Sequence, residues 1–466
     1  MKKIAFIILI FLFPFIAMSQ DITGSWSGKL KIQAMELRVV FNISKTDSGY
    51  NSTMDSPDQG AYGIPVTSTT VEGRKLDLKV ASANIHYGGE FKDSIITGTF
   101  TQGAMSLPLD LRKGSTEKTT LNRPQEPVKP YPYHEEEVTF ENSTAGIKLA
   151  GTLTIPSKEG KFPAVVLISG SGPQNRDEEV FGHKPFLVLA DYLTRNGVAV
   201  LRYDDRGTAG SGGDFKSATS LDNASDAAAA VTYLKTRKEI NKEKIGLIGH
   251  SEGGIIAPML ASDDSDVKFI VLLAGTGIPG HELLLMQQEL IGRASGMSES
   301  DLKTAREINK GAFGIIVKST DTAQLKKDLT AYIRQMIIEH PDVEKPEGVS
   351  DEKFIKEQVD QLVNPWIIFF LKYDPAPALE KVKCPVLALN GEKDLQVPPK
   401  ENLSAIETAL KKGMNDKVTV KELPGLNHLF QECKTGTPGE YIQIEQTISP
   451  SALEEINRWM MENRLK

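Results

Sequence analysis

The stretch Ile245-Gly-Leu-Ile-Gly-His-Ser-Glu-Gly-Gly254 decides the fold. An apolar run, 245–248, leads into a G-x-S-x-G motif, and a second apolar run, 255–260, follows with helical character. In a strand–turn–helix context this motif holds its serine in a strained turn whose neighbours must be small. The turn also places the hydroxyl at a helix N-terminus, where developing negative charge is favoured. Ser251 is therefore the candidate nucleophile.

Similar apolar runs occur on both sides of this motif. They are typical of strands buried on both faces of a parallel sheet, and the stretches between them have a helical pattern. The runs cover residues 164–168, 198–201, 245–248, 269–273 and 386–389. The alternation predicts a doubly wound, mostly parallel α/β domain over residues 136–466.

One connection is too long for this pattern. A helix crossover needs about a dozen residues, whereas the chain between Gly275 and Cys384 is many times longer. It is amphipathic, and residues 298–301 resemble a capping box. We expect a helical lid at about 279–380 that covers the catalytic face. The alternative is an insertion that packs away from the site.

A serine nucleophile needs a base, and the base needs an orienting acid. Of the seven histidines, His428 comes late in the chain, in a loop after the predicted strand 418–423, as the order Ser…Asp…His requires. Asp394 follows the run 386–389 and is the expected acid. Glu392, earlier in the same turn, is the rival and suits a loop-forming role better.

The oxyanion hole is expected to use two backbone N–H groups. One belongs to Glu252, directly after the nucleophile. The other comes from the loop Ser169-Gly-Ser-Gly-Pro173, which follows the first long buried run. Pro173 has no N–H to donate, so Ser171 is preferred and Gly172 is the runner-up.

Other polar residues are assigned structural roles. His250 is expected to point away from Ser251, and Asp204, Asp205 and Arg206 to pair and pin a loop. The chain has no H-E-x-x-H motif and no phosphate-binding or dinucleotide fingerprint, so we expect no metal and no cofactor. Its two cysteines are not expected to form a disulfide.

The N-terminus is typical of a secretory signal peptide over residues 1–19. Two lysines precede an apolar run, 4–17, that is too short to span a bilayer. Small residues then precede a cleavage point near Gln20, and no cysteine lies there to carry a lipid. We expect an exported protein, periplasmic or extracellular, without a membrane span after cleavage. An uncleaved membrane anchor is the alternative.

Residues 20–113 have the short alternating strands and glycine-rich turns of a small all-β domain, and residues 114–135 form a proline-rich linker. The net charge of −7 provides no basic excess for a nucleic-acid partner. The β domain carries no catalytic constellation. It is expected either to bind an envelope glycan or protein, or only to cover the catalytic domain.

These motifs together resemble the α/β-hydrolase superfamily, and more narrowly the EstD-type carboxylesterases and serine aminopeptidase-like hydrolases. The resemblance rests on the motifs already quoted and on Tyr203-Asp-Asp-Arg-Gly207. It covers roughly residues 136–466. It supports the triad Ser251, Asp394 and His428, and implies hydrolysis of short acyl esters. Where other hydrolases carry His-Gly in the oxyanion loop this chain has Ser169-Gly170, which makes the donor assignment less secure than the triad.

The expected function is hydrolysis of a small-molecule ester, with a short acyl chain or a small aryl group, through an acyl-enzyme. The alternative is an aminopeptidase or dipeptidyl-type peptidase on the same triad. Such a peptidase needs an anionic pocket for the substrate amine, for which Glu289 and Asp374 of the predicted lid are candidates.

Overall fold

The computed structural model describes residues 22–32, 35–46, 49–59, 61–102, 105–114, 122–341 and 349–466. The predicted signal peptide and the linker residues 115–121 lie outside the described residues. No helix in the described part of the chain is both long and apolar enough to cross a bilayer.

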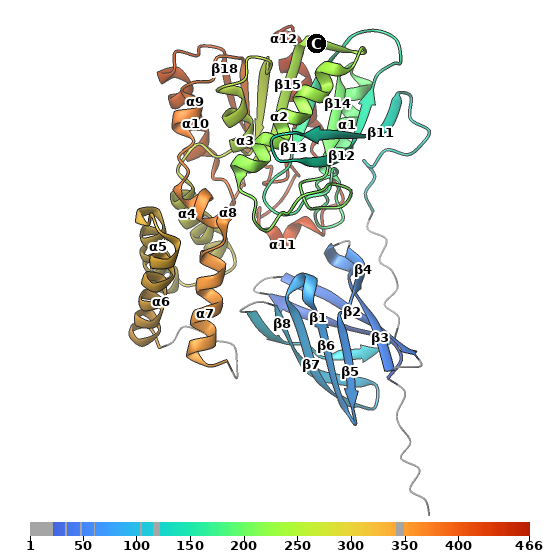
Figure 1. The fold of residues 1–466 in the computed structure, drawn as a ribbon, viewed down its shortest axis with the longest axis vertical. Helices are drawn as coiled ribbons and strands as arrows, with labels where there is room; N and C mark the ends of the chain where they lie inside the picture. Colours follow the sequence, from blue (N-terminus) through green and yellow to red (C-terminus); the bar gives the residue numbers. More distant parts are fainter. Residues whose placement is uncertain are drawn as a thin grey trace, which may run out of the picture.

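The N-terminal unit is a curled antiparallel sheet, drawn in blue in Figure 1. Its strand order is β4-β3-β2-β1-β10-β8-β7-β6-β5, with β9 paired to β8. The strands are β1 Gly24–Ile32, β2 Met35–Thr46, β3 Gly49–Ser56, β4 Ala61–Pro65, β5 Ser68–Glu72, β6 Lys75–Val80, β7 Ile85–Lys92, β8 Ile95–Gln102, β9 Met105–Pro108 and β10 Leu111–Lys113. Thr69 Oγ1 of β5 donates to Ser52 Oγ of β3 at 2.9 Å, so the sheet bends back on itself. It encloses a core that contains Trp26, Phe41 and Tyr87.

The second unit is built on a mixed eight-stranded sheet with the order β11-β12-β14-β13-β15-β16-β17-β18. The strands are β11 His134–Asn142, β12 Ile147–Ile155, β13 Phe162–Ile168, β14 Ala199–Tyr203, β15 Ile240–His250, β16 Phe269–Leu273, β17 Val386–Gly391 and β18 Val418–Leu423. The pairs β11–β12 and β12–β14 are antiparallel, and all later pairs are parallel. The sheet agrees with the mostly parallel α/β architecture predicted from the apolar runs.

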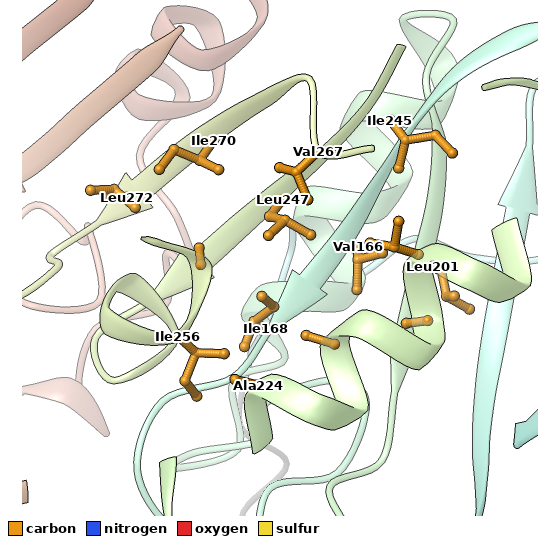
Figure 2. Packing of buried hydrophobic residues seen from close by; sticks show 14 of the residues in the cluster. Val166, Ile168, Leu201, Ala224, Ile245, Leu247, Ile256, Val267, Ile270 and Leu272 are labelled. Atoms are coloured by element: carbon orange, nitrogen blue, oxygen red, sulfur yellow. The ribbon is translucent and has the colours of Figure 1, made fainter. Parts of the chain in front are cut away.

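Helices cover both faces of this sheet. They are α1 Pro185–Arg195, α2 Ser220–Thr236, α3 Gly253–Ala261, α10 Pro399–Lys412 and α12 Pro450–Glu462, whereas the short helix α11 Pro438–Tyr441 lies beyond the ends of the strands (Figure 1). Val166 and Ile168 of β13 pack toward α2 and α3, as Figure 2 shows, whereas Val165 and Leu167 pack toward α1 and α12. Successive side chains of a strand point to opposite faces. A strand covered by helices on both sides is therefore apolar throughout, as the sequence pattern predicted.

The long connection between β16 and β17 folds into helices. They are α4 Gly280–Ala294, α5 Glu299–Lys318, α6 Thr322–Glu339, α7 Asp351–Leu362, α8 Pro365–Lys372 and α9 Ala376–Leu379. In Figure 1 they run from brown to orange, and α5, α6 and α7 project away from the sheet. Ser298 caps α5 by accepting a hydrogen bond from the Asp301 amide. The insertion has its own apolar cluster, and a second cluster joins Leu283 and Phe370 to Ile255 of α3.

The described part of the linker is fixed to the catalytic unit. Arg123 donates to the carbonyl oxygens of Phe181 and Ile444, at 2.9 and 2.7 Å. The Gln125 side chain hydrogen-bonds to the backbone of Thr447 and Ile448. The proline-rich segment thus follows the surface of the α/β unit before it enters β11.

Candidate active site

Ser251 occupies a tight turn between β15 and α3. Its φ is +51°, a left-handed conformation that non-glycine residues rarely adopt. Its amide donates to the Leu273 carbonyl of β16 at 2.8 Å, which fixes the turn to the sheet. A Cβ on Gly249 would lie 2.0 Å from the Gly253 oxygen, and one on Gly253 would lie 2.1 Å from the Ile168 oxygen. The two glycines of the motif are therefore needed because backbone fills the space that a side chain would take.

Asp394 and His428 form a buried pair at the carboxyl end of the sheet. His428 Nδ1 lies 2.8 Å from Asp394 Oδ2. The other carboxylate oxygen, Oδ1, accepts the amides of Gln396 and Val397 at 2.8 and 2.9 Å, so the carboxylate cannot rotate freely. In this arrangement Nδ1 of His428 carries the ring proton and donates it in a hydrogen bond to Asp394. Nε2 of His428 is then the nitrogen that can accept a proton.

The rival acid, Glu392, has a structural role in the loop. Its Oε2 accepts the Gly425 amide at 2.8 Å and so holds the turn that leads from β18 toward His428. Glu392 is exposed. Of the two acids in this turn, Asp394 is the one in contact with the imidazole.

Ser251 and His428 line one cavity of about 420 Å³. Its walls are largely apolar and come from several elements. Leu283 and Leu284 of α4 and Trp366 and Phe370 of α8 belong to the helical insertion. The insertion therefore contributes directly to the wall of the cavity.

The predicted oxyanion donors come from two places: Ser171 is on the loop after β13, and Glu252 follows Ser251 in the nucleophile turn. Gly170 N–H is already engaged, because it donates to Glu178 Oε1 at 2.6 Å. In the described part of the chain the amides of Ser171 and Glu252 contact no acceptor, and both residues line the cavity. Ser171 lines both this cavity and a neighbouring one, whereas Gly172 lines only the neighbouring one. The choice of Ser171 over Gly172 stays a prediction.

Buried acids lie beneath this loop. Asp205 accepts Ser169 Oγ at 2.7 Å and the Gln174 amide at 3.0 Å. Burial, together with the nearby charges of Glu178 and Glu252, raises the pKa of Asp205 to about 8 even though its two hydrogen bonds act in the opposite direction. Asp205 has the loop-pinning role that the sequence indicated, although its partners are Ser169 and Gln174.

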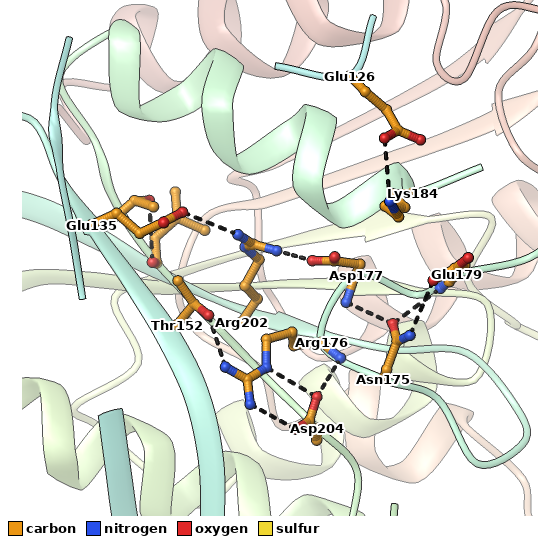
Figure 3. A network of polar contacts seen from close by, with 12 residues as sticks. Glu126, Glu135, Thr152, Asn175, Arg176, Asp177, Glu179, Lys184, Arg202 and Asp204 are labelled. Carbon is orange, nitrogen blue, oxygen red and sulfur yellow. Dashed lines mark hydrogen bonds and ion pairs between the residues drawn. The ribbon is translucent and has the colours of Figure 1, made fainter. Parts of the chain in front are cut away.

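The neighbouring acid and base pair with different partners. Asp204 binds Arg176, which also donates to Thr152 at 2.9 Å (Figure 3). Arg206 binds Asp226 of α2. Asp204 and Arg206 therefore hold loops in place, but not by pairing with each other.

Glu252 joins the nucleophile turn to the helical insertion. Its Oε1 accepts Ser220 Oγ at 2.6 Å and the indole N–H of Trp366 at 2.8 Å, and the Ser171 side chain also hydrogen-bonds to it. Burial raises the pKa of Glu252 despite these donors. Sequence reasoning used only the backbone of Glu252. Its side-chain partner Trp366 lies far away in the sequence, and no local pattern links the two.

His183 is fully buried and outside the cavity. It contacts Thr447, the Tyr441 carbonyl and Gln431, all at 3.0 Å. Burial lowers its pKa to about 4. Among the described residues no group of three or more His, Cys, Asp or Glu is arranged to hold a metal ion.

Comparison with known proteins places this architecture in a family. Residues 145–422, more than half of the chain, match the model of the X-Pro dipeptidyl-peptidase (S15) family. Esterase EstD of Thermotoga maritima is 26% identical over 338 residues, which cover 72% of this chain and 69% of the esterase. The uncharacterized protein PA2218 of Pseudomonas aeruginosa is 29% identical over 39% of this chain and 50% of its own length.

Among solved structures, the Pyrococcus furiosus esterase Pf2001 aligns with a TM-score of 0.44 and 15% identity, over 74% of this chain and 99% of its own. The family match spans the sheet from β12 to β18 and includes Ser251 and Asp394. The chain is a hydrolase of the α/β-hydrolase fold, and it belongs to the X-Pro dipeptidyl-peptidase (S15) family.

Proposed function

We propose that this protein is a serine carboxylesterase that cleaves short-chain or small aryl esters through an acyl-enzyme. The observation that carries the proposal is the buried His428–Asp394 pair, whose His428 lines the same cavity as Ser251 in its strained turn. An activated serine requires this combination of nucleophile, base and orienting acid.

In the proposed reaction Ser251 Oγ attacks the ester carbonyl while Nε2 of His428 takes its proton. Asp394 accepts the Nδ1 hydrogen bond and stabilises the imidazolium that forms. The amides of Ser171 and Glu252 stabilise the oxyanion. His428 then protonates the departing alcohol, and water releases the acyl group by the reverse sequence of proton transfers.

The cavity supports a substrate of modest size. A volume of about 420 Å³ with apolar walls suits a short acyl chain or one aromatic ring. We propose that the helical insertion acts as a lid, because α4 and α8 contribute wall residues and Trp366 is hydrogen-bonded to Glu252. A lid of this kind excludes water from the acyl-enzyme until hydrolysis.

A peptidase is the second candidate, because the family model describes X-Pro dipeptidyl-peptidases. Recognition of a substrate ammonium calls for an available carboxylate. The acids among the described cavity residues, Glu178 and Glu252, already accept hydrogen bonds from protein donors. Glu289 pairs with Arg293 and Arg306, and Asp374 lines a different cavity. None of these four carboxylates is therefore available in the described cavity to bind a substrate ammonium, which supports the esterase over the peptidase.

The test is to purify the mature chain and compare p-nitrophenyl acetate and butyrate with alanyl-prolyl-p-nitroanilide. Turnover of the esters that is lost in Ser251→Ala supports the proposal. Faster turnover of the anilide would favour the peptidase instead. No turnover of any substrate, or ester turnover unchanged in Ser251→Ala, would contradict both.

We also propose that residues 1–19 direct export to the periplasm or the extracellular space. An N-terminus near Gln20, measured by mass spectrometry on protein from the secreted or periplasmic fraction, is the expected result. Retention of residue 1 in membrane-bound protein would indicate an uncleaved anchor.

For the β unit, deletion of residues 20–120 followed by kinetics and glycan binding separates a binding module from a cover.

A further inference from the structure

We propose that His250 is a positioning residue which acts as an imidazolium, paired with Glu178, and joins the oxyanion loop to the loop that carries His428. The inference rests on the proposed serine hydrolase chemistry and adds a fourth side chain to its machinery. His250 is the residue before the nucleophile, which motif reasoning leaves as structural.

Both ring nitrogens of His250 face acceptors. Nδ1 lies 2.9 Å from Glu178 Oε1, and Nε2 lies 3.0 Å from the carbonyl oxygen of His428. A carbonyl oxygen only accepts, and a neutral imidazole has a single N–H. Two donated hydrogen bonds therefore require both nitrogens to carry a proton.

Protonation of Glu178 does not provide an alternative. The same Oε1 atom that faces His250 also accepts the Gly170 amide at 2.6 Å. A proton on Oε1 would collide with that N–H, and a proton on Oε2 would not reach His250. Because Oε1 must accept from Gly170, it is the acceptor for His250 as well, and Nδ1 of His250 is the donor in this contact.

This pair lies where three catalytic segments meet. Glu178 engages the amide directly before Ser171, the preferred oxyanion donor, and a Cβ on Gly170 would lie 3.2 Å from Ser251 Cβ. His250 is covalently next to Ser251 and holds the His428 backbone. One imidazolium thus sets the distance between oxyanion donor, nucleophile and base, for which an error of 1 Å can cost about 10²-fold in rate.

The groups that face His250 are consistent with its charge. Burial disfavours the cation, but the carboxylate of Glu178 and, farther away, that of Asp394 raise the pKa of His250 above its ordinary value. The centroid of the His428 ring lies 4.9 Å from that of His250, and the centroid of the Phe430 ring lies 6.5 Å from it. Glu178 supplies the main counter-charge, and its removal is the sharpest perturbation.

Glu178→Gln removes the negative charge beside His250 but keeps the size and shape of the side chain. The amide oxygen of the new side chain can accept from both Gly170 and His250, but it carries no charge. A buried imidazole without its counter-ion loses its extra proton at a lower pH, and it then keeps only one of its two bonds. We expect the ratio of wild-type to variant kcat on p-nitrophenyl butyrate to increase from about pH 6 to about pH 8.5, reaching about tenfold or more, with little change in KM.

The control is Glu179→Gln, which makes the same chemical change one residue away and is expected to leave kcat unchanged across this range. A Glu178→Gln ratio that stays near one, or that is independent of pH, would overturn the proposal. Absence of turnover by the wild-type protein would count against the proposed function instead, and the inference then depends on a measurement that needs no activity.

That measurement is the nitrogen NMR spectrum of wild-type protein labelled with ¹⁵N-histidine, in which the His250 signals are assigned by their absence in His250→Asn. We expect two protonated ring nitrogens at about pH 8, where an ordinary histidine is neutral. An unprotonated His250 nitrogen at that pH would overturn the proposal.

Discussion

Replacement of Asp394 by asparagine tests the proposed triad at the atom where it is most constrained. In the wild-type protein Oδ1 accepts two backbone amides and Oδ2 accepts Nδ1 of His428. The new side chain has one oxygen and one NH₂ group. Its oxygen is expected to stay with the two amides, because the flipped orientation would leave both N–H groups unpaired at about 1–3 kcal/mol each.

The NH₂ group then faces His428 and forces Nδ1 to become an acceptor. The ring proton moves to Nε2, which can no longer take the proton of Ser251. A triad with the wrong tautomer loses about 10⁴-fold in kcat, or about 5.5 kcal/mol of transition-state stabilisation. We expect a loss of this size on p-nitrophenyl butyrate, with KM nearly unchanged because Asp394 is buried behind His428.

The matched control is Glu392→Gln, two residues away in the same turn. The new amide oxygen can still accept the Gly425 N–H, so we expect kcat within about threefold of wild type, since exposed polar groups contribute little. A loss of less than about tenfold in kcat for Asp394→Asn, or an equal loss for Glu392→Gln, would contradict the role of Asp394 as the orienting acid.

Three further outcomes follow from the structure. Gly253→Ala should lower the free energy of unfolding by about 3 kcal/mol, the upper end of the usual range for overpacking, because its Cβ would lie 2.1 Å from a backbone oxygen of β13; an unchanged melting temperature would contradict this. Trp366→Phe removes the hydrogen bond to Glu252 but keeps an aromatic wall, so KM for the butyrate ester should rise by several-fold while kcat changes less, and an unaffected KM would argue against the lid. The pKa of His183 is about 4 in the folded protein and 6.5 in the unfolded chain, so only the unfolded chain takes up a proton between these values. The free energy of unfolding should therefore fall by at most about 3 kcal/mol as the pH drops from 6.5 to about 4. Denaturant titrations of His183→Gln should show a weaker dependence on pH.

The sequence predicted the six parallel strands β13–β18, because burial on both faces leaves uninterrupted apolar runs, but it did not predict β11 and β12. The predicted strands 269–273 and 418–423 agree with β16 and β18 at both ends. β15 begins at residue 240, five residues before the predicted start. Its residues 241–244 are polar and partly or fully exposed, so they lack the apolar signal.

The geometry of the site was predictable only in part. Ser251, Asp394 and His428 each follow a strand of the parallel sheet, and the carboxyl ends of such strands meet at one edge. The contacts of Glu178 with His250 and of Glu252 with Trp366 join loops and helices that are far apart in the sequence. No periodicity encodes such contacts, because they depend on how each loop folds against the sheet.

The most direct test of the central claim is labelling of the intact protein with a fluorophosphonate, followed by peptide mass spectrometry. We expect one adduct per chain, on the peptide that contains Ser251, and no adduct in Ser251→Ala. We also expect Asp394→Asn, with Ser251 intact, to be labelled far more slowly. An adduct on another residue, or equal labelling of wild type and Ser251→Ala, would contradict the assignment of Ser251 as the nucleophile.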